Sequence, residues 1–348
     1  MDAFTTSPAL HNKLSDRTSH YQRFWCFARF GALIAILILA GTRLHHGEVR
    51  TAFTRLTLFD IVVVVFVLSP LGVLLRALRW RYLLPEGDHL PLRDYVGAYL
   101  VGVLANSLLL GRFGDLVKAR FICGSRLAYA RSLAVVAIDR VLEGVGLLLI
   151  FVAVMFNSHL PGWTHKLAWT AGLTSVGILV ALRLVARHRS GFLDRIEPAL
   201  RRLPSFLASR SLVAARRLVS GCEVLEDYSR VVITLMYAVT VWGVEIVTVT
   251  IFLSAFSIPR PWFLPAVVVL VVLNFGMLIP ISPGSVGVYQ LLCSFALSLW
   301  GVNREVGFSL GIAMQTVLFV PLYVAGGVWL LVSARSRGKH PQGSAVEN

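Results

Sequence analysis

The sequence is poor in charged residues. Only 15% of its 348 residues are Asp, Glu, Lys or Arg, whereas soluble domains carry about 25%. Hydrophobic residues make up 56% of the chain, and the longest apolar run, 231–256, exceeds the ~20 residues that cross a bilayer. The length would suit two soluble domains, but such runs exclude that class. We therefore predict an all-α polytopic membrane protein.

Acidic residues are scarcer than basic ones, with 18 Asp and Glu against 33 Lys and Arg and a net charge of +15. Such an excess can indicate nucleic-acid binding. Here the arginines lie in gaps between apolar runs, and no folded basic domain remains to carry that function. The pattern is typical of the positive-inside rule and suits anionic lipid headgroups. We predict membrane lipids as partners and no nucleic acid.

Cysteine is also scarce, and two common catalytic signatures are missing. The cysteines lie far apart without CxxC spacing, which favours small apolar fillers over disulfides or metal ligands; they are Cys26, Cys123, Cys222 and Cys293. No P-loop and no HExxH motif occurs. We predict no catalytic residue, no cofactor and no metal site, and the sequence argues against an enzyme without excluding a membrane transferase.

About seven to nine hydrophobic segments are expected. They lie at 27–41, 58–75, 95–110, 132–156, 167–186, 231–256, 262–279, 285–300 and 305–332. A membrane domain over 25–335 thus has halves at about 25–186 and 231–335. The arginine-rich linker 187–230 is too polar to cross and is typical of a surface amphipathic helix. We predict that the protein lies in the inner membrane of a cell. Its end segments, 1–24 and 336–348, are predicted to be cytoplasmic.

The basic gaps set the predicted topology. Segment 183–230 holds ten arginines, and 76–93 holds Arg76, Arg79, Arg81 and Arg93, so both are placed in the cytoplasm. A full crossing by 95–110 would then put the basic segment 111–131 outside. We predict instead a re-entrant hairpin with its turn at 108–115, where Gly111 and Gly114 supply flexibility.

A second hairpin follows from the same reasoning. Segments 262–279 and 305–332 both start outside if the C-terminus is cytoplasmic, so 262–300 returns to its own side or crosses twice. Its turn is expected at 280–287, which contains Pro280, Pro283, Gly284 and Gly287. Broken backbone at membrane depth is tolerated only where protein or a watery cavity covers it. Paired interrupted segments in two halves point to a transporter's binding site.

Ionisable residues inside apolar segments are the candidate site residues, because such groups are costly in a bilayer. Asp139 and Glu143 share one helix face, and Arg140 is their neighbour; they form either a site or a structural ion pair. Glu245 lies at the middle of its segment, where it either serves function or locks helices through a buried bond.

The first hairpin adds a basic cluster. Arg112, Asp115, Lys118 and Arg120 would form an anion site at a helix end, because N–H groups and guanidinium forks suit phosphate. The alternative is that these are ordinary basic residues of a cytoplasmic segment, as the positive-inside rule expects. This alternative fits Lys118 well and Arg112 poorly.

Four stretches occur in an order that resembles the flippase-like membrane domain of lysylphosphatidylglycerol synthases. They are GRFGDLVKAR (111–120), SLAVVAIDRVLEG (132–144), WGVE (242–245) and PISPGSVGVYQ (280–290). The family pattern R-x-G-E-x-x-R is similar to Arg112, Gly114 and Asp115, with Arg120 taken as the second arginine, further along the chain than the pattern places it.

The other two family patterns also resemble this sequence with substitutions. S-x-x-x-V-x-x-x-R-x-x-D is similar to Ser132, Val136 and Arg140, with Glu143 in place of aspartate. P-x-x-P-G-G-x-G-x-x-E is similar to Pro280, Pro283, Gly284 and Gly287. There Ser285 replaces a glycine and Gln290 replaces the acidic residue, which leaves an amide that would still bind a headgroup.

The resemblance implies a lipid translocase domain without the soluble aminoacyltransferase domain. The moved lipid would be a phospholipid, an aminoacyl-lipid or a polyprenyl- or hopanoid-type lipid. Arg112 and Arg140 would hold a phosphate, while Glu245 and Asp139 would balance charge, bind an amine or take a proton. A membrane-embedded lipid-modifying transferase, a non-transporting partner of lipid-synthesis proteins, and a homo-oligomer stay open.

Overall fold

The computed structural model describes residues 54–84, 90–108, 113–122, 129–155, 162–200, 211–213, 215–216, 219, 222–277 and 283–338. The chain divides into two compact units, Met1–Arg50 and Thr51–Asn348, and every described residue lies in the second. The predictions for 1–24, 27–41, Gly111, Arg112, Pro280 and the end of the tail therefore lie outside the described residues.

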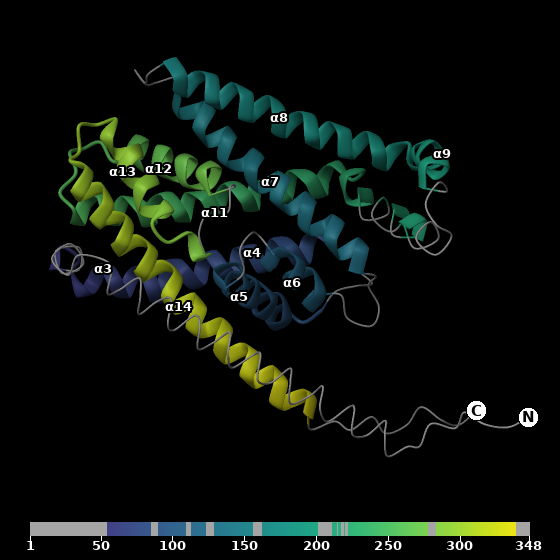
Figure 1. Cartoon of the computed structure of the whole chain (residues 1–348), viewed down its shortest axis with the longest axis horizontal. Helices are drawn as coiled ribbons and strands as arrows, with labels where there is room; N and C mark the ends of the chain where they lie inside the picture. Colours follow the sequence, from purple (N-terminus) through teal and green to yellow (C-terminus); the bar gives the residue numbers. More distant parts are fainter. Residues whose placement is uncertain are drawn as a thin grey trace, which may run out of the picture. The chain divides into compact units, whose positions relative to one another are not determined.

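The described residues are helical and contain no strand, which confirms the all-α prediction for this part of the chain (Figure 1). The helices of the first half are α3 (Leu58–Val63), the π-helical η1 (Val64–Leu68), α4 (Ser69–Leu83), α5 (Leu92–Leu108), α6 (Phe113–Ile122), α7 (Tyr129–Met155) and α8 (Gly162–Arg187). Those that follow are α9 (Arg189–Leu200), η3 (Cys222–Leu225), α11 (Tyr228–Ala255), α12 (Phe263–Gly276), η4 (Pro283–Ser285), α13 (Val288–Ser298) and α14 (Arg304–Gly338).

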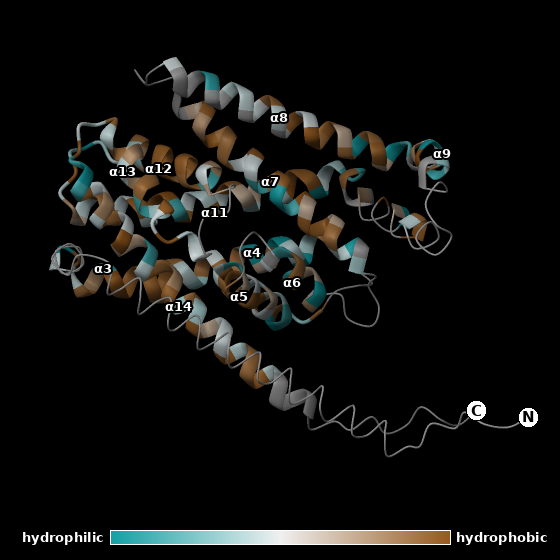
Figure 2. Cartoon of the chain, in the orientation of Figure 1, coloured by the Kyte–Doolittle hydropathy of each residue, from teal (hydrophilic) through white to brown (hydrophobic). Residues whose placement is uncertain are grey.

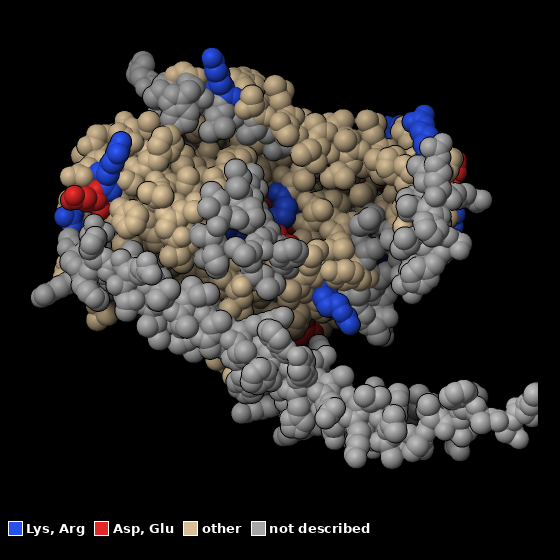
Figure 3. All heavy atoms as spheres, in the orientation of Figure 1, with Lys and Arg blue, Asp and Glu red and all other residues tan. Residues whose placement is uncertain are grey.

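Within the part of the chain that the structure describes, three continuous stretches of helix are long and apolar enough to cross a bilayer. They are Leu58–Leu83, Tyr228–Ala255 and Arg304–Ser333, whose most apolar 18-residue windows have mean hydropathies of 2.7, 1.9 and 1.9. Large apolar side chains stay exposed on the outside of the helices, as Phe59, Phe66 and Leu331 illustrate. Hydrophobic residues are abundant along the ribbon (Figure 2), and most of the described surface visible in Figure 3 is uncharged. These features are those of a multi-pass membrane protein.

Two pairs of short helices interrupt the long ones. The first hairpin consists of α5 and α6, and the second of α12 and α13; within each pair the helices pack together. Helices α6, α12 and α13 have 10, 14 and 11 residues. At about 1.5 Å per residue, none of the three reaches the ~30 Å of a hydrocarbon core. The second predicted interruption is present as a break between α12 and α13, whereas residues 109–112 of the first lie outside the described residues.

Glycines bring the helices of the first hairpin into contact. A Cβ on Gly114 would overlap the carbonyl oxygen of Gly102, and a Cβ on Gly102 would overlap the side chain of Lys118. Gly114 lies inside α6, and its N–H donates to Asn106 Oδ1 at 2.7 Å. The prediction that Gly114 supplies flexibility to a turn is therefore wrong. Its lack of a side chain permits close packing instead.

Helix α14 packs against both hairpins (Figure 1). Near its start, a Cβ on Gly307 or Gly311 would lie 2.7 Å from Ser294 Cα or 2.8 Å from Gln290 Cα of α13. Further along, a Cβ on Gly326 would lie 2.6 Å from the carbonyl oxygen of Leu100 in α5. Small residues spaced by four are a common means of close helix packing in membranes.

The stretch Gly307-Phe-Ser-Leu-Gly311 also has the G-x-S-x-G spacing of serine hydrolases. That motif requires a sharp strand-to-helix turn that exposes the serine. Here it lies within the continuous helix α14, and Ser309 is buried. Its two glycines serve the contact with α13.

The linker 187–230 contains α9, a helix of 12 residues that includes Pro198. It also contains the short helix η3. Cys222 in η3 is buried, as is Cys293 in α13. Burial raises the pKa of the Cys222 thiol above its usual value. Both cysteines thus fit the predicted role of small apolar fillers.

Candidate functional site: a buried ion-pair network beside a cavity

Helix α4 brings two arginines into the interior. The sequence prediction ended this segment at residue 75 and counted Arg76 and Arg79 among cytoplasmic loop residues. The helix continues to Leu83 without a break. Arg79 is only 1% exposed, and it lies one helical turn from Arg76. Buried arginines require anionic partners, because an unpaired charge in a low-dielectric interior is very costly.

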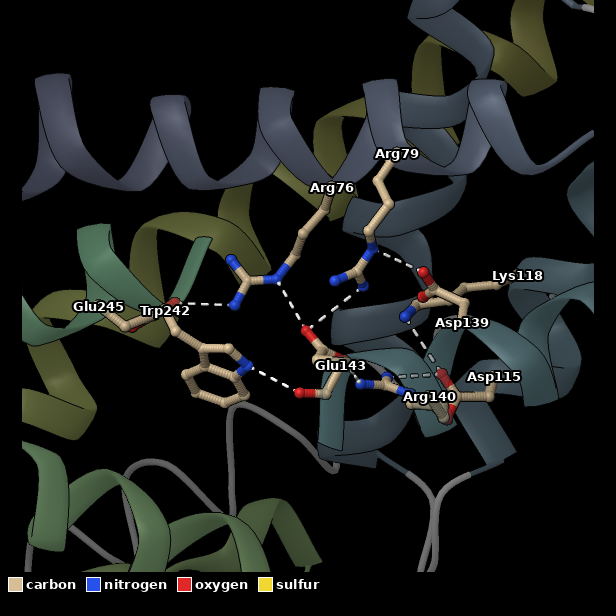
Figure 4. Close-up of polar contacts among 9 residues, drawn as sticks. All are labelled: Arg76, Arg79, Asp115, Lys118, Asp139, Arg140, Glu143, Trp242 and Glu245. Atoms are coloured by element: carbon tan, nitrogen blue, oxygen red, sulfur yellow. Dashed lines mark hydrogen bonds and ion pairs between the residues drawn. The ribbon is translucent and has the colours of Figure 1, made fainter. Parts of the chain in front are cut away.

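The partners of these arginines come from α7 and α11 (Figure 4). Arg79 Nε lies 2.7 Å from Asp139 Oδ1, and one Nη of Arg79 lies 3.5 Å from Glu143 Oε1. Arg76 Nε lies 3.5 Å from the same oxygen of Glu143. Arg76 Nη2 also donates to Glu245 Oε1 at 2.9 Å. Glu143 thus joins the two arginines of α4.

Helix α6 contributes the second part of the network. Arg140 donates two hydrogen bonds to Asp115, at 3.1 Å from Nε and 2.8 Å from Nη2. Its third contact is to Glu143 Oε2, at 2.8 Å from Nη1. Lys118 Nζ lies 3.1 Å from Asp115 Oδ1 and is 3% exposed. Such bidentate pairing fixes the guanidinium of Arg140 in one orientation.

The ion-pair network is balanced in charge. Its members are the cations Arg76, Arg79, Lys118 and Arg140 and the anions Asp115, Asp139, Glu143 and Glu245. They come from four helices, α4, α6, α7 and α11. Removal of one partner from a buried pair typically costs about 3–5 kcal/mol, because a charge stays behind without compensation. The network therefore fixes how these four helices meet.

Aromatic side chains complete the surroundings of the network. Trp242 Nε1 donates to the backbone carbonyl of Glu143 at 2.8 Å, which ties α11 to α7. The ring of Tyr99 lies between two cations, with Arg76 Cζ at 5.7 Å and Lys118 Nζ at 5.0 Å from its centroid. Cations are attracted to aromatic faces. Tyr99 thus links α5 to α4 and α6.

A cavity of about 280 Å³ adjoins the network. One part of its wall is charged and comprises Arg76, Arg140, Glu143 and Glu245, while another is apolar and includes Leu270, Leu318 and Phe319. A volume near 300 Å³ lies at the small end of ligand pockets. The cavity can therefore accept a polar group the size of a lipid headgroup, with apolar side chains beside it.

Both hairpins line this cavity. Asn106 and Ser107 come from the end of α5, and Asn274, Gly284 and Ser285 come from the second hairpin. The ends of the hairpins meet, since a Cβ on Gly284 would lie 3.6 Å from the backbone oxygen of Ser107. Asn106 and Asn274, one from each hairpin, thus lie at the same cavity.

A chain of amides holds the turn of the second hairpin. Gly287 N–H donates to Gln290 Oε1, Gln290 Nε2 donates to Gln315 Oε1, and Gln315 Nε2 donates to the carbonyl oxygen of Gly284, each at 2.7 Å. We call these contacts the amide chain. Within the turn, Gly284, Ser285 and Gly287 have positive φ values of 60°, 57° and 84°. Gln290 thus fixes the backbone here rather than pointing freely into the cavity.

The structure brings five of the predicted site residues into one network and separates others from it. Asp115, Asp139, Arg140, Glu143 and Glu245 belong to it, whereas Arg120 is exposed on α6. Lys118, interpreted as surface decoration, is buried within the network. Counting the first family pattern from Arg112 places its second basic residue at Lys118. Such a count would have identified Lys118 as a site residue.

Arg76, Arg79 and Gln315 were missed by the sequence interpretation. The signal for the arginines was their i, i+3 spacing in a stretch without a helix breaker, RALRWRYLL (76–84). The charge count for topology hid it, because every arginine outside an apolar run was assigned to a loop. Gln315 carried no comparable signal, since its role depends on a turn that is 31 residues away.

The sequence of the chain was also compared with models of protein families. The model for the lysylphosphatidylglycerol synthase TM region matches residues 27–326, which is most of the chain. Neither the search of curated proteins nor that of solved structures gave a match. Among the described residues, no three His, Cys, Asp or Glu side chains are grouped to hold a metal ion. Because the family model spans both halves and most of the chain, the chain belongs to the lysylphosphatidylglycerol synthase TM region family.

Proposed function

We propose that this protein moves an amphiphilic lipid between the leaflets of the inner membrane, with the headgroup passing through the cavity. The single observation that carries the proposal is a headgroup-sized cavity lined both by charged residues of the ion-pair network and by apolar residues. A lipid in transit likewise combines a charged or polar headgroup with apolar acyl chains. Its headgroup needs charged and polar partners, because transfer of such groups into hydrocarbon is costly.

The two hairpins are proposed to be re-entrant and to enter from opposite faces of the membrane. The short lengths of α6, α12 and α13 support this, as does the contact between Ser107 and Gly284 at their ends. Interrupted helices that meet at the midplane are the usual means of placing a polar site in a transporter. The arginine-rich segments then place both termini in the cytoplasm.

The charged residues have different proposed roles. Arg76 and Arg140 line the cavity and would bind a phosphate, and Glu245 would bind an amine or balance the charge. Asp139 neutralises Arg79 at a 2.7 Å separation and does not line the cavity. Its contribution would therefore be to hold α4 against α7.

Leaflet exchange in proteoliposomes tests this function. A fluorescent lipid is placed in both leaflets, and the fraction bleached by an impermeant reductant is followed over time. The wild-type protein should accelerate exchange over protein-free liposomes. Arg76→Ala and Arg140→Ala should each reduce the accelerated rate by about tenfold or more, since each removes a charged contact.

The controls are Arg304→Gln and Glu305→Gln, which change exposed charges at the start of α14. Both should leave the rate unchanged. Wild-type exchange no faster than in protein-free liposomes, for every lipid supplied, would contradict the proposed function. Unchanged rates in both arginine variants would contradict the assigned site.

A further inference from the structure

The pair of Arg76 and Glu245 is a partly accessible cross-helix contact of the network. Their side chains are 15% and 26% exposed, whereas those of Arg79 and Asp139 are 1% and 6% exposed. Both line the cavity. They come from α4 and α11, which share no loop, so the two charges face the cavity from separate helices. The pair is therefore a charged contact that a headgroup in the cavity can reach.

Each member of the pair retains unused hydrogen-bonding capacity. Arg76 engages Glu245 through Nη2 and approaches Glu143 through Nε. Its Nη1 has no hydrogen-bond partner among the described residues, and neither does Glu245 Oε2. A guanidinium carries five N–H donors and a carboxylate about four acceptor sites. The pair thus offers a donor and an acceptor side by side.

The charges on this wall favour one class of headgroup. A phosphate that approaches Arg76 also approaches Glu245, so a headgroup with only negative charge meets repulsion. A headgroup with only positive charge is attracted to Glu245 but repelled by Arg76. A headgroup with one phosphate and one amine can satisfy both residues without separating them. The balance of four cations and four anions in the network points in the same direction, because it leaves no net charge to compensate.

We propose that the lipid recognised here is zwitterionic, with a headgroup of no net charge that carries a phosphate and an amine. Its phosphate binds Arg76 and the partly exposed Arg140, and its ammonium binds Glu245. The inference rests on the proposed translocation function and adds the charge class of the substrate. It distinguishes this class from headgroups with a net negative or a net positive charge.

The test measures exchange of three lipids that differ only in the headgroup. The probes are acyl-labelled phosphatidylethanolamine, phosphatidylglycerol and a phospholipid whose headgroup has a net charge of +1, each in neutral carrier liposomes. The wild-type protein should move phosphatidylethanolamine at least ~fivefold faster than the other two, because each of those leaves one residue of the pair facing a like charge.

Charge-changing variants should alter this preference in opposite directions. Glu245→Gln leaves Arg76 without its anion and should shift the preference to phosphatidylglycerol. Arg76→Gln should shift it to the cationic lipid. The double variant Arg76→Gln/Glu245→Gln removes both charges and should move the three lipids at rates within ~twofold of one another. Arg304→Gln and Glu305→Gln make the same changes in charge at the surface and should keep the wild-type preference.

The outcomes separate the two proposals. If no lipid is moved faster than in protein-free liposomes, the translocation function itself is wrong. If lipids are moved but phosphatidylglycerol is as fast as phosphatidylethanolamine, or Glu245→Gln keeps the wild-type ratio, the charge class is wrong and the function stands. Should Arg76→Gln fail to fold, as judged by size-exclusion chromatography in detergent, Glu245→Gln and the double variant still decide the question.

Discussion

At the scale of single residues, the two arginines of α4 illustrate how position decides role. Arg79 is almost fully buried and paired with Asp139, whereas Arg76 lies at the cavity and meets Glu245 through a more exposed contact. The side chains are one helical turn apart and chemically identical. Depth in the helix bundle therefore assigns one to structure and the other to the proposed site.

Arg79→Ala should destabilise the protein by about 3–5 kcal/mol, because it leaves Asp139 buried without its cation. Denaturant unfolding in detergent, followed by circular dichroism, measures the loss. Arg304→Ala at an exposed position should change the free energy of unfolding by no more than about 0.5 kcal/mol. A loss in Arg79→Ala as small as that of the control would contradict the structural role of this pair.

Ser285→Gly should stabilise the protein by up to about 1 kcal/mol. Ser285 has a φ of 57°, in the left-handed region that is strained for residues with a side chain. The family pattern has a glycine there. Thermal unfolding measures the effect, and Ser333→Gly in the helix α14 is the matched change, expected to cost about 1 kcal/mol. A fall in Tm with Ser285→Gly would argue against strain at this turn.

At the scale of elements, the second hairpin depends on α14. The amide chain connects Gly284 and Gln290 through a single side chain, Gln315. The glycines of α14 permit the close approach that this chain requires. The hairpin turn and the long helix therefore form one unit.

Gln315→Ala should destabilise the protein by about 1–3 kcal/mol, because the amide of Gln290 and the carbonyl of Gly284 lose their partner. Hydrogen exchange should speed up at the turn, most clearly at the amide of Gly287. Exchange at α7, which lacks contact with the amide chain, should stay as in the wild type. Equal protection at the turn in both proteins would show that the amide chain does not hold it.

Gly311→Ala should cost about 1–3 kcal/mol, since its Cβ would lie 2.8 Å from Gln290 Cα and overpack the contact between α13 and α14. Gly243→Ala in α11 is the matched control. A Cβ there meets nothing within 4 Å, so the better helix propensity of alanine should add up to about 1 kcal/mol. Thermal unfolding of both variants in one detergent gives the comparison.

At the scale of the whole molecule, the helical architecture follows from the sequence more readily than the site does. The segment expected at 231–256 is observed as Tyr228–Ala255, because apolar length alone defines such a helix. The interruptions were also recognisable from proline and glycine. The ion-pair network was recognised only in part. Its pairs join residues up to 169 positions apart, and no local pattern encodes such contacts.

The dependence on contacts between distant residues also explains the incorrect predictions. Charge counts treat all arginines alike, so Arg76 and Arg79 were assigned to a loop although their helix continues. Gly114 was interpreted as a turn residue, yet its role is to let α6 approach α5. In each case the residue type was informative, and the neighbour that decides its function lies on another helix.

The proposed re-entrant topology makes position 285 informative. A cysteine introduced as Ser285→Cys lies at the cavity and should react with an impermeant maleimide from one side of sealed vesicles only. The wild-type protein is the control for its own cysteines, of which Cys222 and Cys293 are buried. Equal labelling from both sides would contradict a hairpin that enters from one face.

Helix α14 is a continuous element of 35 residues that contacts α13 near its start and α5 further along. A tilt of this helix would therefore move α13 and α5, one helix from each hairpin, at the same time.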